Sequence, residues 1–196
     1  MTRWVLVFFA LVAAWLWFGE DRPISRAPGV IAAAQPLQEE IGPARPRLEK
    51  KGYEIEPLAR FELEARVLRV ERYRLDRGAG LAPVDLALGW GGMSDTAVLE
   101  KIQITQGTRF YYWQADVLPI PRRDIETQSA NMHMVPADGL VARRLKDVRP
   151  GHIVKLSGYL IEARAPDGWR WRSSLSREDT GNGACELIWV ERVELH

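Results

Sequence analysis

Hydrophobic and polar positions alternate along much of the chain after residue 58, as expected for β-strands that bury one face. In RFELEARVLRVERYRL (residues 60–75) the apolar positions are odd-numbered as far as Val67. They then become even-numbered, at Leu68 and Val70. A phase change of one residue inside a strand predicts a β-bulge, and bulges bend strands into curved sheets.

A hairpin and a helix follow in the pattern. KIQITQGTRFYYWQ (residues 101–114) predicts a β-hairpin that turns at Gln106-Gly107. PADGLVARRLKDVRPG (residues 136–151) predicts a short helix that ends at Pro150-Gly151. Its apolar residues share one face, and they are Val141, Leu145 and Val148.

The last third of the chain predicts three more strands. HIVKLSGYLIEA (residues 152–163) is apolar on both faces, which indicates a central strand, and Gly158 in it permits a close approach or a bend. Asp167-Gly168 predicts a turn into WRWRSS, and CELIWVERVEL (residues 185–195) supplies the final strand. This order predicts a mainly β (β-rich α+β) fold, a small curved antiparallel barrel of OB type. Another curved α+β sheet is the alternative.

The first twenty residues differ from the rest. An unbroken apolar run extends from Trp4 to Phe18, and a helix of that length reaches ~22 Å against a hydrocarbon core of ~30 Å. Interfacial tryptophans and local thinning of the bilayer can supply the difference. We expect residues 1–20 to be an uncleaved membrane anchor. A cleaved signal peptide and a buried core helix are the alternatives, but the best small-x-small site, Ala32-Ala33-Ala34, lies far beyond the run.

Arg3 and the amino terminus favour the cytoplasmic side of the membrane. The remainder would then lie outside the cytoplasm, which in a bacterium means a single-pass inner-membrane protein with its C-terminal domain in the periplasm. Residues 21–57 hold half of the twelve prolines and lack apolar periodicity. They predict an extended linker, or alternatively a partner-binding arm, ahead of a domain spanning residues 58–196.

Composition narrows the possible functions. The chain has 27 Lys and Arg against 26 Asp and Glu, so no nucleic-acid partner is expected. A single cysteine excludes an intramolecular disulfide and a cysteine-based zinc site. No nucleotide-binding glycine motif is present, and no His-x-x-x-His spacing indicates a metal. We therefore expect neither a metal nor a cofactor.

Three polar, glycine-containing segments are candidates for a site. DLALGWGGMSD (residues 85–95) contributes Trp90 and Asp95, and either Ser94 or Asp95 could cap a short helix. SANMHMVP (residues 129–136) places Asn131 and His133 on one face if it is extended. A histidine titrates near neutrality and suits acid–base chemistry, although a hydrogen-bonded structural role is the alternative.

The third segment, residues 171–185, contains Arg177, Glu178 and Asp179 ahead of Cys185. An arginine can bind a carboxylate or phosphate through a bidentate fork, and an aspartate can bind a cation or hold that arginine. A loop that satisfies its own polar groups is the alternative. Cys185 begins an apolar strand beside Glu186, which favours a buried, inert thiol over a nucleophile working with His133.

Taken together, DLALGWGGMSD, SANMHMVPAD, VRPGHIVKLSGYLIEA and WRWRSSLSREDTGNGACELIWVE resemble segments of an uncharacterised family of single-anchor bacterial envelope proteins. The resemblance covers about residues 60–195. It implies a place in the cell envelope and brings no known activity or ligand.

The leading hypothesis is a non-enzymatic envelope module that binds a partner protein or an anionic small molecule. Its binding face would combine residues of all three segments: Trp90, Asp95, Asn131, His133, Arg177 and Asp179. One alternative is an envelope hydrolase with His133 as general base and Asp179 or Glu178 orienting it or binding a cation. Another is an OB-type nucleic-acid module, suggested by the alternating aromatics and arginines of GWRWRSSLSR.

Overall fold

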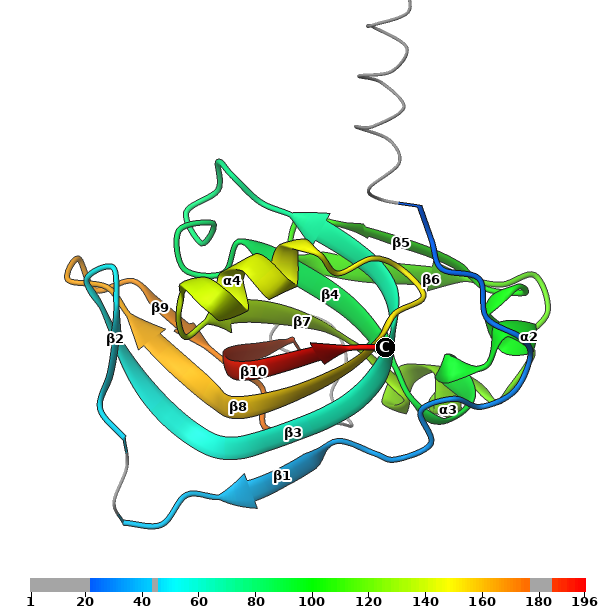
Figure 1. Cartoon of the computed structure of the whole chain (residues 1–196), viewed down its shortest axis with the longest axis horizontal. Coiled ribbons are helices and arrows are strands. Elements are labelled where there is room, and N and C mark those ends of the chain that lie inside the picture. Colours follow the sequence, from blue (N-terminus) through cyan, green and yellow to red (C-terminus); the bar gives the residue numbers. More distant parts are fainter. Residues whose placement is uncertain (1–21, 44–45, 177–184) are drawn as a thin grey trace, which may run out of the picture.

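The computed structural model describes residues 22–43, 46–176 and 185–196. This part of the chain is mainly β, as predicted. Five strands close into a ring in the order β3–β4–β7–β10–β8, because β3 pairs with both β4 and β8 (Figure 1). The ring strands are β3 (Tyr53–Arg72), β4 (Val84–Gly89), β7 (Ser129–Pro136), β8 (Ile153–Arg164) and β10 (Glu186–Leu195).

Shorter elements surround the ring. β1 and β2 pair with β3, β9 pairs with β8, and β5 and β6 form a separate hairpin. These strands are β1 (Leu37–Glu40), β2 (Leu48–Lys50), β5 (Gln103–Gly107), β6 (Phe110–Gln114) and β9 (Arg170–Arg172). The helices are η1 (Gly91–Ser94), α2 (Thr96–Leu99), α3 (Arg122–Thr127) and α4 (Gly139–Lys146).

One ring pairing departs from the predicted antiparallel arrangement. β10 runs parallel to β7, whereas the other ring pairs are antiparallel. Adjacent strands joined by a tight turn must be antiparallel, but β7 and β10 are separated by α4, β8 and β9, and such a long connection permits a parallel pair.

The side chains that point into the ring form the main core. All five strands and α4 contribute to it, and Phe61, Leu86, Met134 and Leu160 are among its almost completely buried members. α4 confirms the predicted helix, although it ends at Lys146 and not at Pro150-Gly151. Val141 and Leu145 from the helix and Val148 after it all pack in this core. The predicted bulge in β3 is confirmed as well: the register shifts between Val67 and Arg69. Val67 thus enters the main core, while Leu68 packs on the outer face.

Gly158 in β8 confirms the predicted close approach. A Cβ atom at this position would lie 1.8 Å from the backbone oxygen of Trp189 in β10. Only glycine lets these two strands come so close, next to the register shift between Val190 and Arg192.

The prediction that residues 21–57 form an extended linker is wrong where this segment joins the sheet. It contains β1, β2 and the start of β3. Upstream of them, Ile24 N donates to Pro150 O at 2.8 Å, and Gly91 N donates to Ala32 O at 2.8 Å. Ahead of β1, backbone groups, the side chain of Arg26 and the buried Ala32 attach the chain, and such contacts leave no apolar periodicity in the sequence.

The predicted hairpin exists, but its turn lies two residues later. Thr108 and Arg109 are the central residues, with φ of 50° and 69°, and Gly107 pairs with Phe110. Among the described residues no helix is long and apolar enough to cross a membrane, and the predicted anchor lies outside them.

Candidate functional site

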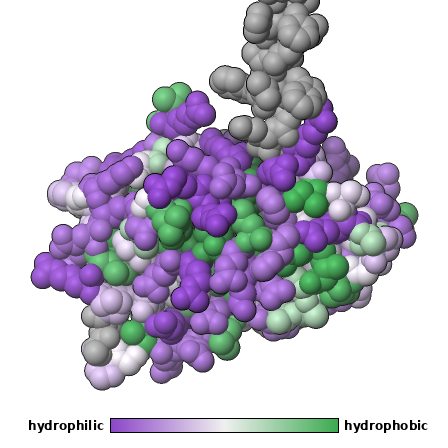
Figure 2. Space-filling model, viewed as in Figure 1, coloured by the Kyte–Doolittle hydropathy of each residue, from purple (hydrophilic) through white to green (hydrophobic). Residues whose placement is uncertain are grey.

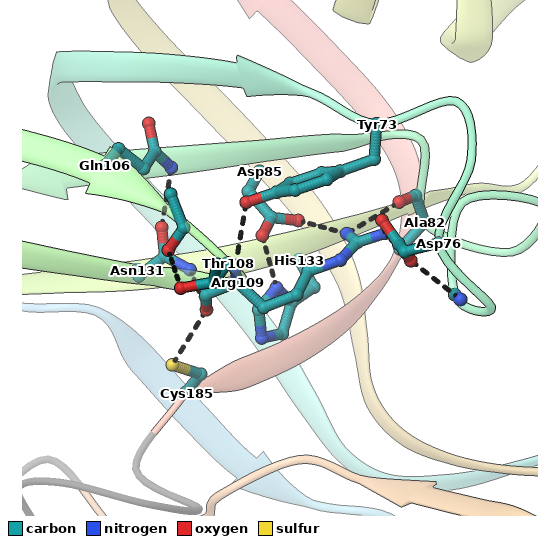
Figure 3. Close-up of polar contacts among 12 residues, drawn as sticks. Tyr73, Asp76, Ala82, Asp85, Gln106, Thr108, Arg109, Asn131, His133 and Cys185 are labelled. Carbon is teal, nitrogen blue, oxygen red and sulfur yellow. Dashed lines mark hydrogen bonds and ion pairs between the residues drawn. The ribbon is translucent and has the colours of Figure 1, made fainter.

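β4 and β7 bring Asp85 and His133 face to face. The two residues are direct cross-strand neighbours, and their side chains point away from the main core. Nδ1 of His133 lies 2.9 Å from Oδ2 of Asp85 (Figure 3). Asp85 is fully buried and His133 is 3% exposed. The two atoms lie within ion-pair distance, but neither has a hydrogen-bond partner among the described residues.

Arg109 closes the cluster from the tip of the β5–β6 hairpin (Figure 3). Its Nη1 lies 2.8 Å from Oδ1 of Asp85, and its Nη2 contacts both carboxylate oxygens of Asp76 at 2.8 and 2.9 Å. Nη1 also donates to the backbone oxygen of Ala82 at 2.9 Å. The guanidinium therefore joins two carboxylates with the planar fork that only arginine provides.

Tyr73, the first residue of the loop between β3 and β4, packs against the same guanidinium. The guanidinium carbon of Arg109 lies 3.7 Å from the centre of the Tyr73 ring, and Arg109 N donates to the tyrosine hydroxyl at 2.9 Å. Burial raises the pKa of Tyr73, and the hydrogen bond from Arg109 only partly offsets this. Charge, stacking and backbone contact together hold the hairpin tip on the ring.

Asn131 holds the other side of the hairpin. Gln106 Nε2 donates to Asn131 Oδ1 at 2.6 Å, and Asn131 Nδ2 donates to Arg109 O at 2.9 Å. Sγ of Cys185 lies 3.8 Å from the same Arg109 oxygen. Asn131 is 2% exposed, so it positions the hairpin from within rather than facing solvent.

A row of aromatic side chains runs outward from His133. The rings of His133 and Trp171 are 4.6 Å apart, Trp171 and Trp169 are 5.8 Å apart, and Trp169 and Tyr53 are 5.9 Å apart. Arg77 lies 5.1 Å above Trp169. We call Tyr53, Trp169 and Trp171 the aromatic strip; all three are partly exposed.

The other predicted site residues lie elsewhere. Trp90 is 2% exposed and belongs to the main core, because it follows β4 directly and its ring turns inward. Asp95 caps α2, as predicted for either Ser94 or Asp95, and accepts from Ala97 N and Gly29 N, both at 2.8 Å. These hydrogen bonds lower the pKa of Asp95. Arg177, Glu178 and Asp179 lie outside the described residues.

Four members of the cluster were not predicted as site residues: Tyr73, Asp76, Asp85 and Arg109. One signal existed for Asp85, since a charged residue between Val84 and Leu86 interrupts an apolar strand. Nothing in the sequence pointed to Arg109, whose partners come from a loop and a strand 24 or more residues away.

Chemically, the cluster provides a buried imidazole, a fixed guanidinium and a neighbouring aromatic surface. Within the described ranges, no group of three His, Cys, Asp or Glu side chains is placed to hold a metal ion.

Comparison with known proteins found no matching protein-family model, no matching curated protein and no matching solved structure. Function therefore has to be argued from the site itself.

Proposed function

We propose that this protein is a membrane-anchored, extracytoplasmic ligand-binding module of OB type. Two features of the ring support the OB-type assignment. β3, β4 and β7 are consecutive neighbours in it, and β8 returns to lie beside β3, which is the Greek-key arrangement. A closed ring of five strands with this connection supports an OB-type barrel.

The observation that carries the binding proposal is a buried polar row on β4 and β7. OB-type barrels bind ligands across their second and third strands and the loops beside them. Here those strands are β4 and β7, and Asp85, Asn131 and His133 line their outer face. The loop after β3 supplies Tyr73 and Asp76, and the chain after β8 supplies Trp169 and Trp171 of the aromatic strip.

The aromatic strip indicates the kind of ligand. Partly exposed aromatic rings bind planar or sugar rings by stacking. The guanidiniums of Arg77 and Arg109 lie against Trp169 and Trp171, and both are already paired with aspartates. We therefore propose a small molecule or envelope component that contains such a ring. A formal net charge of +1 gives no basis for tight binding of a nucleic acid.

The membrane part of the proposal depends on residues 1–20. Ile24 is hydrogen-bonded to Pro150, so only three residues would separate an anchor ending at residue 20 from the domain. The domain would then sit directly on the periplasmic surface of the inner membrane. Active alkaline phosphatase fused after His196 supports this topology, and activity of a cytoplasmic reporter alone at that position contradicts it.

Ligand binding is testable with the purified full chain in detergent micelles. The probes are soluble peptidoglycan fragments, glycerol phosphate and a short single-stranded DNA, with intrinsic tryptophan fluorescence as the signal. Trp171→Leu should weaken binding of the recognised probe at least tenfold. Trp113→Leu is the matched control, because Trp113 is a partly exposed tryptophan on β6 outside the strip. An equal effect of both substitutions, or of neither, contradicts the proposed site.

A hydrolase is the second candidate, and one observation favours it: a carboxylate oxygen of Asp85 lies 2.9 Å from Nδ1 of His133, as in pairs of a catalytic base and its orienting carboxylate. In the hydrolase hypothesis Asp85 has the orienting role that was predicted for Asp179 or Glu178. Release of soluble fragments from peptidoglycan by the wild-type chain, and its loss in His133→Asn, would support hydrolysis. Unchanged release in the variant would exclude His133 as the base.

A further inference from the structure

A second polar cluster lies on β8 and β9, around Glu162. This carboxylate is fully buried, and three arginines converge on it. Oε1 accepts from Arg164 Nε at 2.7 Å and from Arg170 Nε and Nη2 at 2.9 and 2.6 Å. Oε2 accepts from Arg172 Nη1 at 2.6 Å.

Strand register places these side chains together. Glu162 pairs with Arg172 and Arg164 pairs with Arg170 across β8 and β9, so all four project from one face of the sheet. Glu56 on β3 pairs with Glu162 from the other side, and its Oε2 lies 2.8 Å from Arg164 Nη2. Trp171 lies between Arg170 and Arg172 on β9, and its side chain projects from the opposite face, toward His133. The arginine cluster is therefore separate from the cluster around His133.

The buried carboxylate keeps this arrangement charged. Burial alone would raise the pKa of Glu162, but the hydrogen bonds from Arg172, Arg170 and Arg164 lower it to about 2. Glu162 is thus ionised throughout the physiological range. Glu56 and Glu54 pair with Glu162 and Arg164 from β3, and with them the charges of the group balance.

The arginines retain hydrogen-bond donors. The side chains of Arg164, Arg170 and Arg172 are 40%, 61% and 53% exposed. Within the described part of the chain, no hydrogen bond or ion pair is made by Nε or Nη2 of Arg172, or by Nη1 of Arg164 and Arg170. All three arginines are needed to satisfy the oxygens of the buried Glu162, and each of them keeps at least one fixed donor at the surface.

We propose that Arg164, Arg170 and Arg172 form a binding site for an oxyanion, either a phosphate or a carboxylate. Glu162 orients the three guanidiniums from the buried side, and their remaining N–H groups bind the anion on the solvent side. Arginine suits this task because its planar fork matches carboxylate and phosphate oxygens. The site does not depend on the proposed site on β4 and β7.

The test uses the full chain in a neutral detergent at fixed ionic strength. Isothermal titration with inorganic phosphate, and separately with acetate, should give saturable binding of at least one anion. Arg170→Gln and Arg172→Gln should each weaken this binding at least tenfold. Arg122→Gln is the matched control, since Arg122 is an exposed arginine that pairs with a single carboxylate, Glu126, on α3. It should leave the affinity unchanged.

Two further measurements identify the source of the anion and provide a substitute for a variant that fails to fold. Flotation with vesicles containing phosphatidylglycerol, against neutral vesicles, tests whether a lipid headgroup supplies the phosphate. Arg170→Lys keeps the charge but removes the fork, and it replaces Arg170→Gln if that variant fails to fold. Arg170→Gln should leave binding of the ring-containing probe in the fluorescence assay unchanged, so failure at one proposed site is distinguishable from failure at the other.

The proposal is overturned if neither anion binds and the vesicles do not float the chain. It is equally overturned if Arg170→Gln and Arg172→Gln bind as tightly as Arg122→Gln.

Discussion

Asp85 and His133 meet across the neighbouring strands β4 and β7, with Oδ2 and Nδ1 2.9 Å apart on the outer face of the ring. Arg109 contacts the other oxygen of the same carboxylate at 2.8 Å. One buried aspartate thus links the imidazole to the hairpin that covers it. The pair also joins two of the three polar segments that the sequence singled out.

Replacing Asp85 should destabilise the fold strongly. Asp85→Ala leaves Arg109 without its buried partner, and breaking a buried ion pair in this way lowers the free energy of unfolding by about 3 kcal/mol. Asp76→Ala removes a carboxylate that is 38% exposed, for which we expect a loss of about 1 kcal/mol or less. Urea unfolding followed by circular dichroism measures both. Similar losses in the free energy of unfolding of the two variants would contradict the assignment of Asp85 as the main partner of Arg109.

The hairpin turn can be improved by substitution. Thr108 has a φ of 50°, and a left-handed conformation strains a β-branched residue. Thr108→Asn should raise the free energy of unfolding by about 0.5–1 kcal/mol, because asparagine is favoured in two-residue hairpin turns with positive φ. Thr105→Asn on β5 is the control and should not stabilise, since asparagine is disfavoured in strands. A thermal melt that ranks Thr105→Asn above Thr108→Asn would refute this account of the turn.

Gly158 should not tolerate a side chain. The Cβ of Gly158→Ala would lie 1.8 Å from Trp189 O, and backbone must move to relieve that contact. We expect a loss of about 3 kcal/mol in the free energy of unfolding. Gly80→Ala, where nothing lies within 4 Å of the new atom, should change stability by about 0.5 kcal/mol at most. If both variants have the melting temperature of the wild type, the close approach of β8 and β10 is wrong.

Glu162 should make stability depend on acid. Its pKa is lowered from 4.5 to about 2 in the folded chain, so the unfolded chain binds a proton first as the pH falls. The contribution of Glu162 is therefore complete above about pH 4.5 and is lost as the pH falls toward 2. Unfolding free energies measured from pH 5.5 to 2.5 should decline more steeply for the wild type than for Glu162→Gln. Parallel curves would show that the three arginines do not hold the carboxylate ionised.

Much of the ring could be predicted because its pattern is local. The bulge at Leu68, the helix face of Val141 and Leu145, and the close approach at Gly158 each leave a signature within a few residues. β1 has no such signature in the sequence, because all four of its residues are exposed and only backbone pairing with β3 defines it.

The site could be predicted only in part. Asn131 and His133 alternate with Ala130 and Met132, a period of two that correctly placed them on one face. That this outer face is buried follows from the hairpin that covers it, and this depends on contacts between Arg109 and residues distant in the sequence. Pattern within one segment cannot reveal such contacts.

The three histidines allow the most direct test of the proposed ligand site on β4 and β7. Only His133 lies in it; His152 accepts a hydrogen bond from Arg149 N in the turn before β8, and His196 is terminal. We would titrate the full chain, labelled with ¹³C and ¹⁵N in histidine, with the probe that binds in the fluorescence assay. The account predicts that the His133 imidazole signal shifts on saturation while those of His152 and His196 stay in place. A bound probe that moves His152 or His196 and leaves His133 unchanged would contradict it.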